Sequence, residues 1–186
     1  MRSSSRNSRE HSGAVLGLVA AVSLLTGECA QAGEHNFVLT AYSNGKGGTQ
    51  LLSGDYDAAG KALQFHPTLS AFDGSTNSNN RCVAFAKTKQ FEAARAACDK
   101  AVHEAEHEKA SLPSYQYWAR SLENDYVAVA LSNRAVLHWM TSDSEAAAAD
   151  LKRAAELSPK SAFVLRNKSA LEYSQTAVAR VDVASK

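Results

Sequence analysis

The sequence predicts an all-α fold in which antiparallel helical hairpins stack side by side. Three observations support this prediction. The tripeptides Asn133-Arg134-Ala135 and Asn167-Lys168-Ser169 stand 34 residues apart, a spacing typical of helical-hairpin repeats. Between them, apolar and small residues recur at the three-and-four spacing of helices packed on one face. The same stretch also carries turn and helix-start signals that divide it into two short helices.

Residues 1–32 have the pattern of a signal peptide. Three arginines precede an apolar run over residues 14–25, and Ala30-Gln31-Ala32 fits the small-x-small pattern of a cleavage site. The run is shorter than the about 20 residues that a membrane-spanning helix needs. An uncleaved anchor and a lipid anchor on Cys29 are the alternatives, and the acidic Glu28 disfavours the second. We expect the mature chain to begin at Gly33.

The folded domain is predicted over residues 33–174, and its first hairpin over about residues 36–67. Gly54-Asp55-Tyr56 with the apolar residues that follow predicts a turn and a second helix. Three glycines between positions 45 and 48 weaken the signal for its first helix. Residues 68–79 are rich in Ser, Asn and Thr, which predicts a loop.

A second hairpin is predicted over about residues 78–109, where Asn80-Arg81 corresponds to Asn133-Arg134. These two pairs are 53 residues apart, about 19 more than one repeat. We expect the additional residues between His107 and Asp125, in an extended first helix of the next hairpin.

The third hairpin, over residues 114–158, carries the strongest signals. Ser142 and Glu145 have the spacing of a capping box at the start of its second helix. Ser158-Pro159 predicts the N-cap and first turn of a capping helix over residues 159–174. Residues 175–186 show no helical stripe and are predicted to form a flexible tail.

These motifs resemble the tetratricopeptide repeat family. The resemblance implies a short right-handed superhelix whose first helices line a concave groove, and a protein that binds other proteins rather than catalysing a reaction. The pattern is closest to small exported repeat proteins of Gram-negative bacteria. One subfamily clamps a carboxylate with basic residues, but Phe163 and Asn167 occupy those positions here. The groove positions that the resemblance implies are Asn80, Val83, Lys87, Asn133, Val136, Trp139, Met140, Asn167 and Ala170.

Two roles are open for these groove residues. Asn80, Asn133 and Asn167 could hydrogen-bond the main chain of an extended peptide, or bond their own neighbouring helices. Trp139 and Met140 could anchor a partner's side chain, or pack against the following helix.

The charge balance argues against nucleic acid and membrane surfaces as partners. The whole chain has a net charge of +1, and residues 1–32 contain three basic and two acidic residues, so the mature chain is neutral. A neutral chain exerts no long-range attraction on phosphate or anionic lipid. After cleavage of the signal peptide, we expect no membrane span.

His103-Glu104-x-x-His107 matches the zinc-protease pattern. A zinc hydrolase needs a third ligand and an apolar setting, whereas this stretch is rich in Glu and Lys. A solvated helix face is the preferred interpretation. We therefore predict no catalytic residue, no metal site and no cofactor.

Cys82 and Cys98 fall on the two helices of one predicted hairpin, at positions that face each other. In an oxidising compartment they would form a disulfide. Two buried thiols are the alternative.

The sequence thus predicts a non-catalytic interaction scaffold or accessory subunit, exported to the periplasm, with a protein or peptide partner. A self-associating structural or stress-related envelope protein is the alternative, and a zinc hydrolase is a remote one. Self-association is suggested because a few hairpins leave stacking surface uncovered.

Overall fold

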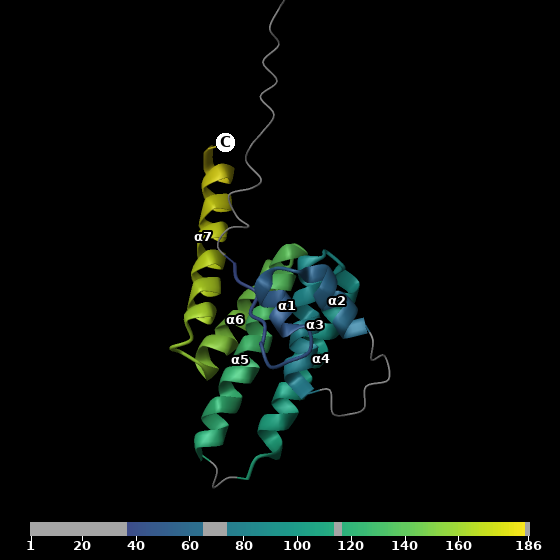
Figure 1. Ribbon diagram of the computed structural model, residues 1–186. Helices are drawn as coiled ribbons and strands as arrows, with labels where there is room; N and C mark the ends of the chain where they lie inside the picture. Colours follow the sequence, from purple (N-terminus) through teal and green to yellow (C-terminus); the bar gives the residue numbers. More distant parts are fainter. Residues whose placement is uncertain (1–36, 65–73, 114–116, 185–186) are drawn as a thin grey trace, which may run out of the picture. The chain divides into compact units, whose positions relative to one another are not determined.

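The computed structural model describes residues 37–64, 74–113 and 117–184. These residues form helices and no strand, so the predicted all-α class is confirmed (Figure 1). The signal-peptide prediction and Cys29 lie outside the described residues. No helix in the described ranges has both the length and the apolarity needed to cross a bilayer. The helices are α1 Gly48–Ser53, α2 Tyr56–Gln64, α3 Gly74–Lys87, α4 Phe91–Ser111, α5 Tyr117–Met140, α6 Ser144–Leu157 and α7 Ala162–Ala184.

Helices α3 and α4, and helices α5 and α6, form two hairpins with the same turn. Lys89 in the first turn and Ser142 in the second both adopt a positive φ, of 58° and 64°. In each turn, the next residue donates its N–H to a carbonyl five residues back, from Gln90 to Phe85 and from Asp143 to His138. This pattern closes the C-terminal end of a helix. The two hairpins therefore repeat each other with the 53-residue offset seen in the sequence.

The first predicted hairpin differs from the structure. Its second helix is present as α2, but its first helix is limited to the six residues of α1. Residues 37–46 are not helical and run as an extended segment ending in a turn. This segment is called the strap below. Its extended part finds hydrogen-bond partners on distant helices, and its turn contains one main-chain bond, from the Gly45 N–H to the Tyr42 carbonyl oxygen (3.2 Å).

Helix α3 begins earlier than predicted, inside the expected loop over residues 68–79. Glu108 of α4 accepts hydrogen bonds from the Ser75 N–H (2.9 Å) and the Ser75 hydroxyl (2.6 Å). A carboxylate at this position satisfies free N–H groups and the positive end of the helix dipole. The polar composition of residues 74–79 suggested a loop, but these tertiary partners stabilise a helix.

The extra residues between the hairpins lengthen α5, as predicted, and they also lengthen α4 to Ser111. Two predicted caps are wrong. Asp143, not Ser142, caps α6 by accepting the Ala146 N–H at 3.1 Å. Ser158 ends α6 and donates its hydroxyl to Asp125 (2.6 Å), so α7 begins at Ala162 rather than at Pro159. Neither serine acts as the predicted N-cap. Ser142 adopts the positive φ of the turn, and the Ser158 hydroxyl is used in its bond to Asp125.

Helix α7 extends to Ala184, through the residues predicted to be a tail. Residues 175–184 contain no Gly or Pro and several alanines. Once a helix is nucleated, each further residue of this kind adds a hydrogen bond at little cost. The helix therefore continues through these residues although they show no apolar stripe, and the predicted tail is wrong.

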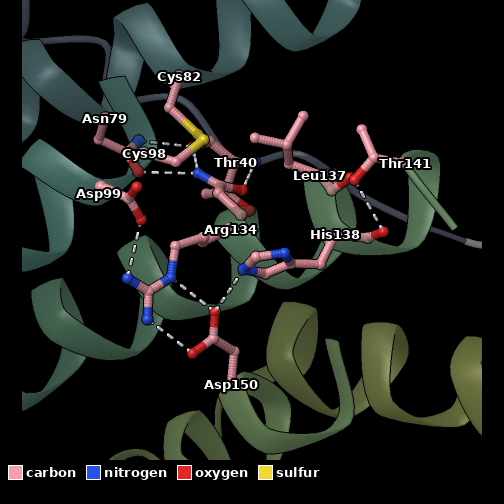
Figure 2. Close-up of a disulfide and its surroundings, with 11 residues drawn as sticks. Thr40, Asn79, Cys82, Cys98, Asp99, Arg134, Leu137, His138, Thr141 and Asp150 are labelled. Carbon is pink, nitrogen blue, oxygen red and sulfur yellow. Dashed lines mark hydrogen bonds and ion pairs between the residues drawn. A yellow bond between two sulfur atoms is a disulfide. The ribbon is translucent and has the colours of Figure 1, made fainter. Parts of the chain in front are cut away.

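Small residues let the helices pack closely. Ala101, Ala105, Ala128 and Ala154 are fully buried in one cluster that joins α4, α5, α6 and α7. Beside it, the Arg134 guanidinium of α5 donates to both carboxylate oxygens of Asp150 on α6 (2.7 and 2.8 Å) and to Asp99 on α4 (3.1 Å). Figure 2 shows Arg134 between these two acids. One cation therefore ties three consecutive helices together.

The disulfide between Cys82 and Cys98 is present and confirms the predicted pairing. It joins α3 to α4, and both cysteines are fully buried (Figure 2). Leu137 of α5 packs in the same cluster. The bridge therefore fixes the helix that carries Asn79 and Asn80 against the rest of the domain.

Candidate peptide-binding groove

The strap lies across α7, α5 and α3 and is held by asparagine side chains. Val38, Thr40 and Tyr42 each donate their N–H to an asparagine Oδ1, and the Nδ2 of the same asparagine donates back to the carbonyl oxygen of that residue. The pairs are Val38 with Asn167 (2.7 and 2.8 Å), Thr40 with Asn133 (2.8 and 2.8 Å) and Tyr42 with Asn80 (2.8 and 2.8 Å). Every second residue from Val38 to Tyr42 thus both donates to and accepts from one asparagine side chain.

Asn80, Asn133 and Asn167, called the asparagine ladder below, are all 0% exposed. Two of them also bond side chains on neighbouring helices. Asn133 Nδ2 donates to Asn79 Oδ1 (2.8 Å), and Asn167 Nδ2 donates to the Ser132 hydroxyl (2.9 Å). A buried amide is costly unless its donors and acceptor are used. The main chain of the strap therefore supplies the hydrogen-bond partners that keep these amides from being unsatisfied. Both roles left open by the sequence have a counterpart within the chain: the asparagines bond an extended main chain, which is the protein's own strap, and Asn133 and Asn167 also bond side chains of neighbouring helices.

The side chains of the strap fill one side of the groove. The Phe37 ring lies 4.4 Å from the Trp139 ring, centre to centre. Leu39 packs against the cluster around the disulfide, beside Met140. A cavity of about 180 Å³ remains here, lined in part by Lys87 and Val136. Trp139 thus contacts the strap and also packs against the α5–α6–α7 cluster. Met140 packs against the same cluster as Leu39 and lines the same cavity.

A second cavity, of about 420 Å³, borders Thr40 and Tyr42. The Tyr42 ring lies 5.2 Å from the Tyr126 ring. Burial raises the pKa of the Tyr42 phenol well above its ordinary value, and Tyr126 and Asp125 add to the shift. The phenol is therefore neutral at physiological pH, and its ring packs as an uncharged side chain beside the cavity.

The remaining predicted groove residues play supporting roles. Lys87 is exposed, and its ammonium lies 5.9 Å from the centre of the Tyr56 ring. Val83 is buried among α1, α2 and α3, in the cluster that Leu39 and Ala41 of the strap also contact. Ala170 is buried on α7. The structure thus brings all the predicted groove residues except Ala170 into the ladder, its cavity or the adjoining cluster.

The histidines of the zinc-protease pattern do not converge. His103 and His107 are both exposed. Glu104 accepts a hydrogen bond from the Ser78 hydroxyl and pairs with Lys100 at 3.5 Å. Within the described ranges, no three His, Cys, Asp or Glu side chains lie close enough together to hold a metal ion.

The sequence analysis did not identify the strap, Asn77 or Asn79. Asn77 Oδ1 accepts the Lys46 N–H (2.7 Å), and Asn79 Nδ2 donates to the carbonyl oxygen of Thr40 (2.8 Å). Residues 37–42 form a short run rich in β-branched and aromatic residues, a composition typical of extended segments. That composition was the available signal for the strap.

Glu123 of α5 provides a pH-dependent test of the packing. Burial, and then the charge of Glu108, raises the pKa of Glu123 above its ordinary value. The folded protein therefore holds this proton more tightly than the unfolded chain, so stability falls as the pH rises through and above the ordinary Glu range.

We expect Glu123→Gln to stabilise the protein at pH 7 by less than about 1 kcal/mol, because water screens a partly exposed carboxylate. The gain should vanish at about pH 3, well below the ordinary Glu pKa, where the carboxyl is protonated in both states. Urea unfolding at the two pH values measures this, with Glu156→Gln, at an exposed position on α6, as the control. An equal gain at both pH values would contradict the charge argument.

No protein-family model matches the chain, and comparisons with curated proteins and with solved structures found no match. The ladder and its strap are therefore the observations on which a function rests.

Proposed function

We propose that this protein is a non-catalytic interaction module that binds an extended segment of another polypeptide across α3, α5 and α7. The observation that carries the proposal is the asparagine ladder, whose three buried amides bond the main chain of alternate residues. Main-chain bonding supplies affinity in many complexes with extended peptides, and side-chain pockets supply selectivity.

The proposal includes a tetratricopeptide-like stack of hairpins. The 34-residue recurrence of the asparagine tripeptides and the matching turns at Lys89 and Ser142 support it. So does the position of the ladder, with one asparagine on each of α3, α5 and α7.

We also propose export to the periplasm. The basic lead, the apolar run and Ala30-Gln31-Ala32 support it. The buried Cys82–Cys98 disulfide is compatible with an oxidising compartment.

A photoreactive amino acid at the edge of the groove tests the interaction in cells. Lys87 is exposed and borders the cavity beside Leu39, so a photoreactive residue there should give a defined adduct with another polypeptide. The same residue in place of Lys152, exposed on α6, is the control. Trp139→Ala should reduce the adduct from position 87. Identical adducts from both positions, or none from position 87, would overturn the proposal.

Self-association is a second candidate, favoured by the outer surface of α7. Leu165 and Tyr173 of this helix are 44% and 63% exposed. Exposed apolar side chains on the last helix of a stack are suited to pairing with another copy. Sedimentation velocity over a range of concentrations checks this, and one species at all concentrations would exclude it.

A further inference from the structure

We propose that the strap is a resident ligand of the groove, which must leave before another polypeptide binds. The incoming segment would be extended and would carry an aromatic, an aliphatic and a small residue at alternate positions. This inference rests on the proposed function and adds its regulation and its ligand pattern.

The ladder recognises atoms common to all sequences. Each asparagine bonds both the N–H and the carbonyl oxygen of one strap residue, a pair that every residue except proline provides. None of the ladder bonds involves a side chain of Val38, Thr40 or Tyr42. A different segment without proline at these positions can make the same six bonds.

Selectivity for the bound segment depends on the intervening residues. Phe37 stacks on Trp139, and Leu39 enters the cluster beside Met140. Ala41 contacts the cluster of Leu51 and Val83, where a small side chain fits. These three positions define the alternate pattern of an aromatic, an aliphatic and a small residue.

The strap can leave the groove without unfolding a helix. Residues 37–42 are only partly buried and belong to no helix, whereas the ladder asparagines beneath them are fully buried. Because the strap is part of the chain, its effective concentration at the groove is on the order of millimolar. A separate segment must compete against that concentration, so the strap weakens binding by others.

Gly48 offers a way to displace the strap without changing the strap or the ladder. A Cβ on Gly48 would lie 1.9 Å from the carbonyl oxygen of Tyr42 and 2.9 Å from its carbonyl carbon. These are main-chain atoms of the strap, so Gly48→Ala forces the strap to move. Gly60→Ala is the matched control, because a Cβ on Gly60 meets no atom within 4 Å.

The experiment measures binding of a fluorescent peptide with the sequence of residues 36–44 to the full chain by fluorescence anisotropy. We expect Gly48→Ala to bind the peptide at least about tenfold more tightly than the wild type and the Gly60→Ala control. Adding Asn133→Ala to Gly48→Ala should abolish the gain. A peptide with Phe37 and Leu39 both replaced by Ser should bind weakly to every variant.

A second variant serves as a control, because Gly48→Ala also changes a residue of α1. Replacing Phe37 and Leu39 by Ser in the full chain weakens the strap through its own side chains. This variant should also gain affinity for the wild-type peptide. Hydrogen exchange at the Val38, Thr40 and Tyr42 amides, faster in both variants than in wild type, reports that the strap has been released.

The possible failures are distinguishable. Equal, Asn133-dependent binding of the peptide by wild type and both variants would overturn gating and leave the proposed function standing. Binding that does not depend on Asn133 would place the peptide elsewhere, for example on the outer edge of the strap, and would also overturn the inference. If both variants release the strap and neither binds the peptide, the proposed function fails as well.

Discussion

Replacing Asn133 by Ala should lower the free energy of unfolding by about 3 kcal/mol, because each buried polar group left without a partner costs about 1–3 kcal/mol. Asn133 is 0% exposed and bonds both the N–H and the carbonyl oxygen of Thr40, as well as Asn79. The substitution leaves these groups without their partner and opens space for the side chain that is lost. Urea unfolding followed by circular dichroism measures the change.

Two comparisons sharpen this prediction. Asn44→Ala, at an exposed position in the turn of the strap, should change stability by less than about 0.5 kcal/mol. Asn133→Asp keeps an acceptor for the Thr40 N–H but loses the donor to the Thr40 carbonyl and buries a charge, so it should also be strongly destabilising. If Asn133→Ala cost no more than Asn44→Ala, the ladder would contribute nothing to the folded state.

Replacing Cys82 and Cys98 together by Ala should cost about 3 kcal/mol, since the bridge closes a loop of sequence separation 16. For a domain of this size the melting temperature should fall by about 10 °C. Thermal unfolding without reductant measures the difference. Adding reductant should lower the stability of the wild type and leave the double variant unchanged.

The disulfide prediction has a local consequence that hydrogen exchange can detect. The bridge fixes α3, which carries Asn79 and Asn80, against α4. We expect the Tyr42 amide, which bonds Asn80, to exchange faster in the double variant. The Val38 amide, which bonds Asn167 on α7, should change less. Equal acceleration at both amides would indicate global rather than local loosening.

The repeat units were predictable because their signals are local. Helical periodicity and the facing cysteines depend on residues close together in the sequence, and the 53-residue offset comes from comparing two such local patterns. The structure contains both hairpins and the bridge. The ladder asparagines were also identified, because they recur with the repeat. Their partner could not be assigned, since Val38 and Asn167 are 129 positions apart.

The misassigned segments have a common physical cause. Residues 74–79 have the composition of a loop, but Glu108 and the strap provide partners for their polar groups. The capping box at Ser142 fits the local pattern, yet the turn places Asp143 at the cap. In each case a tertiary contact or the turn geometry outweighed a local preference that differs by about 1 kcal/mol or less.

The direction in which the strap crosses the helices constrains when the fold can be completed. Val38 bonds α7, the last helix, whereas Tyr42 bonds α3. During synthesis, residue 38 leaves the ribosome long before residue 167. Helices α3 and α4 can therefore pair while Val38 still lacks its partner, Asn167. Contacts of such long range form slowly. The bonds between Val38 and Asn167 can therefore form only once α7 has been made, and until then this part of the strap's place on the helices is open.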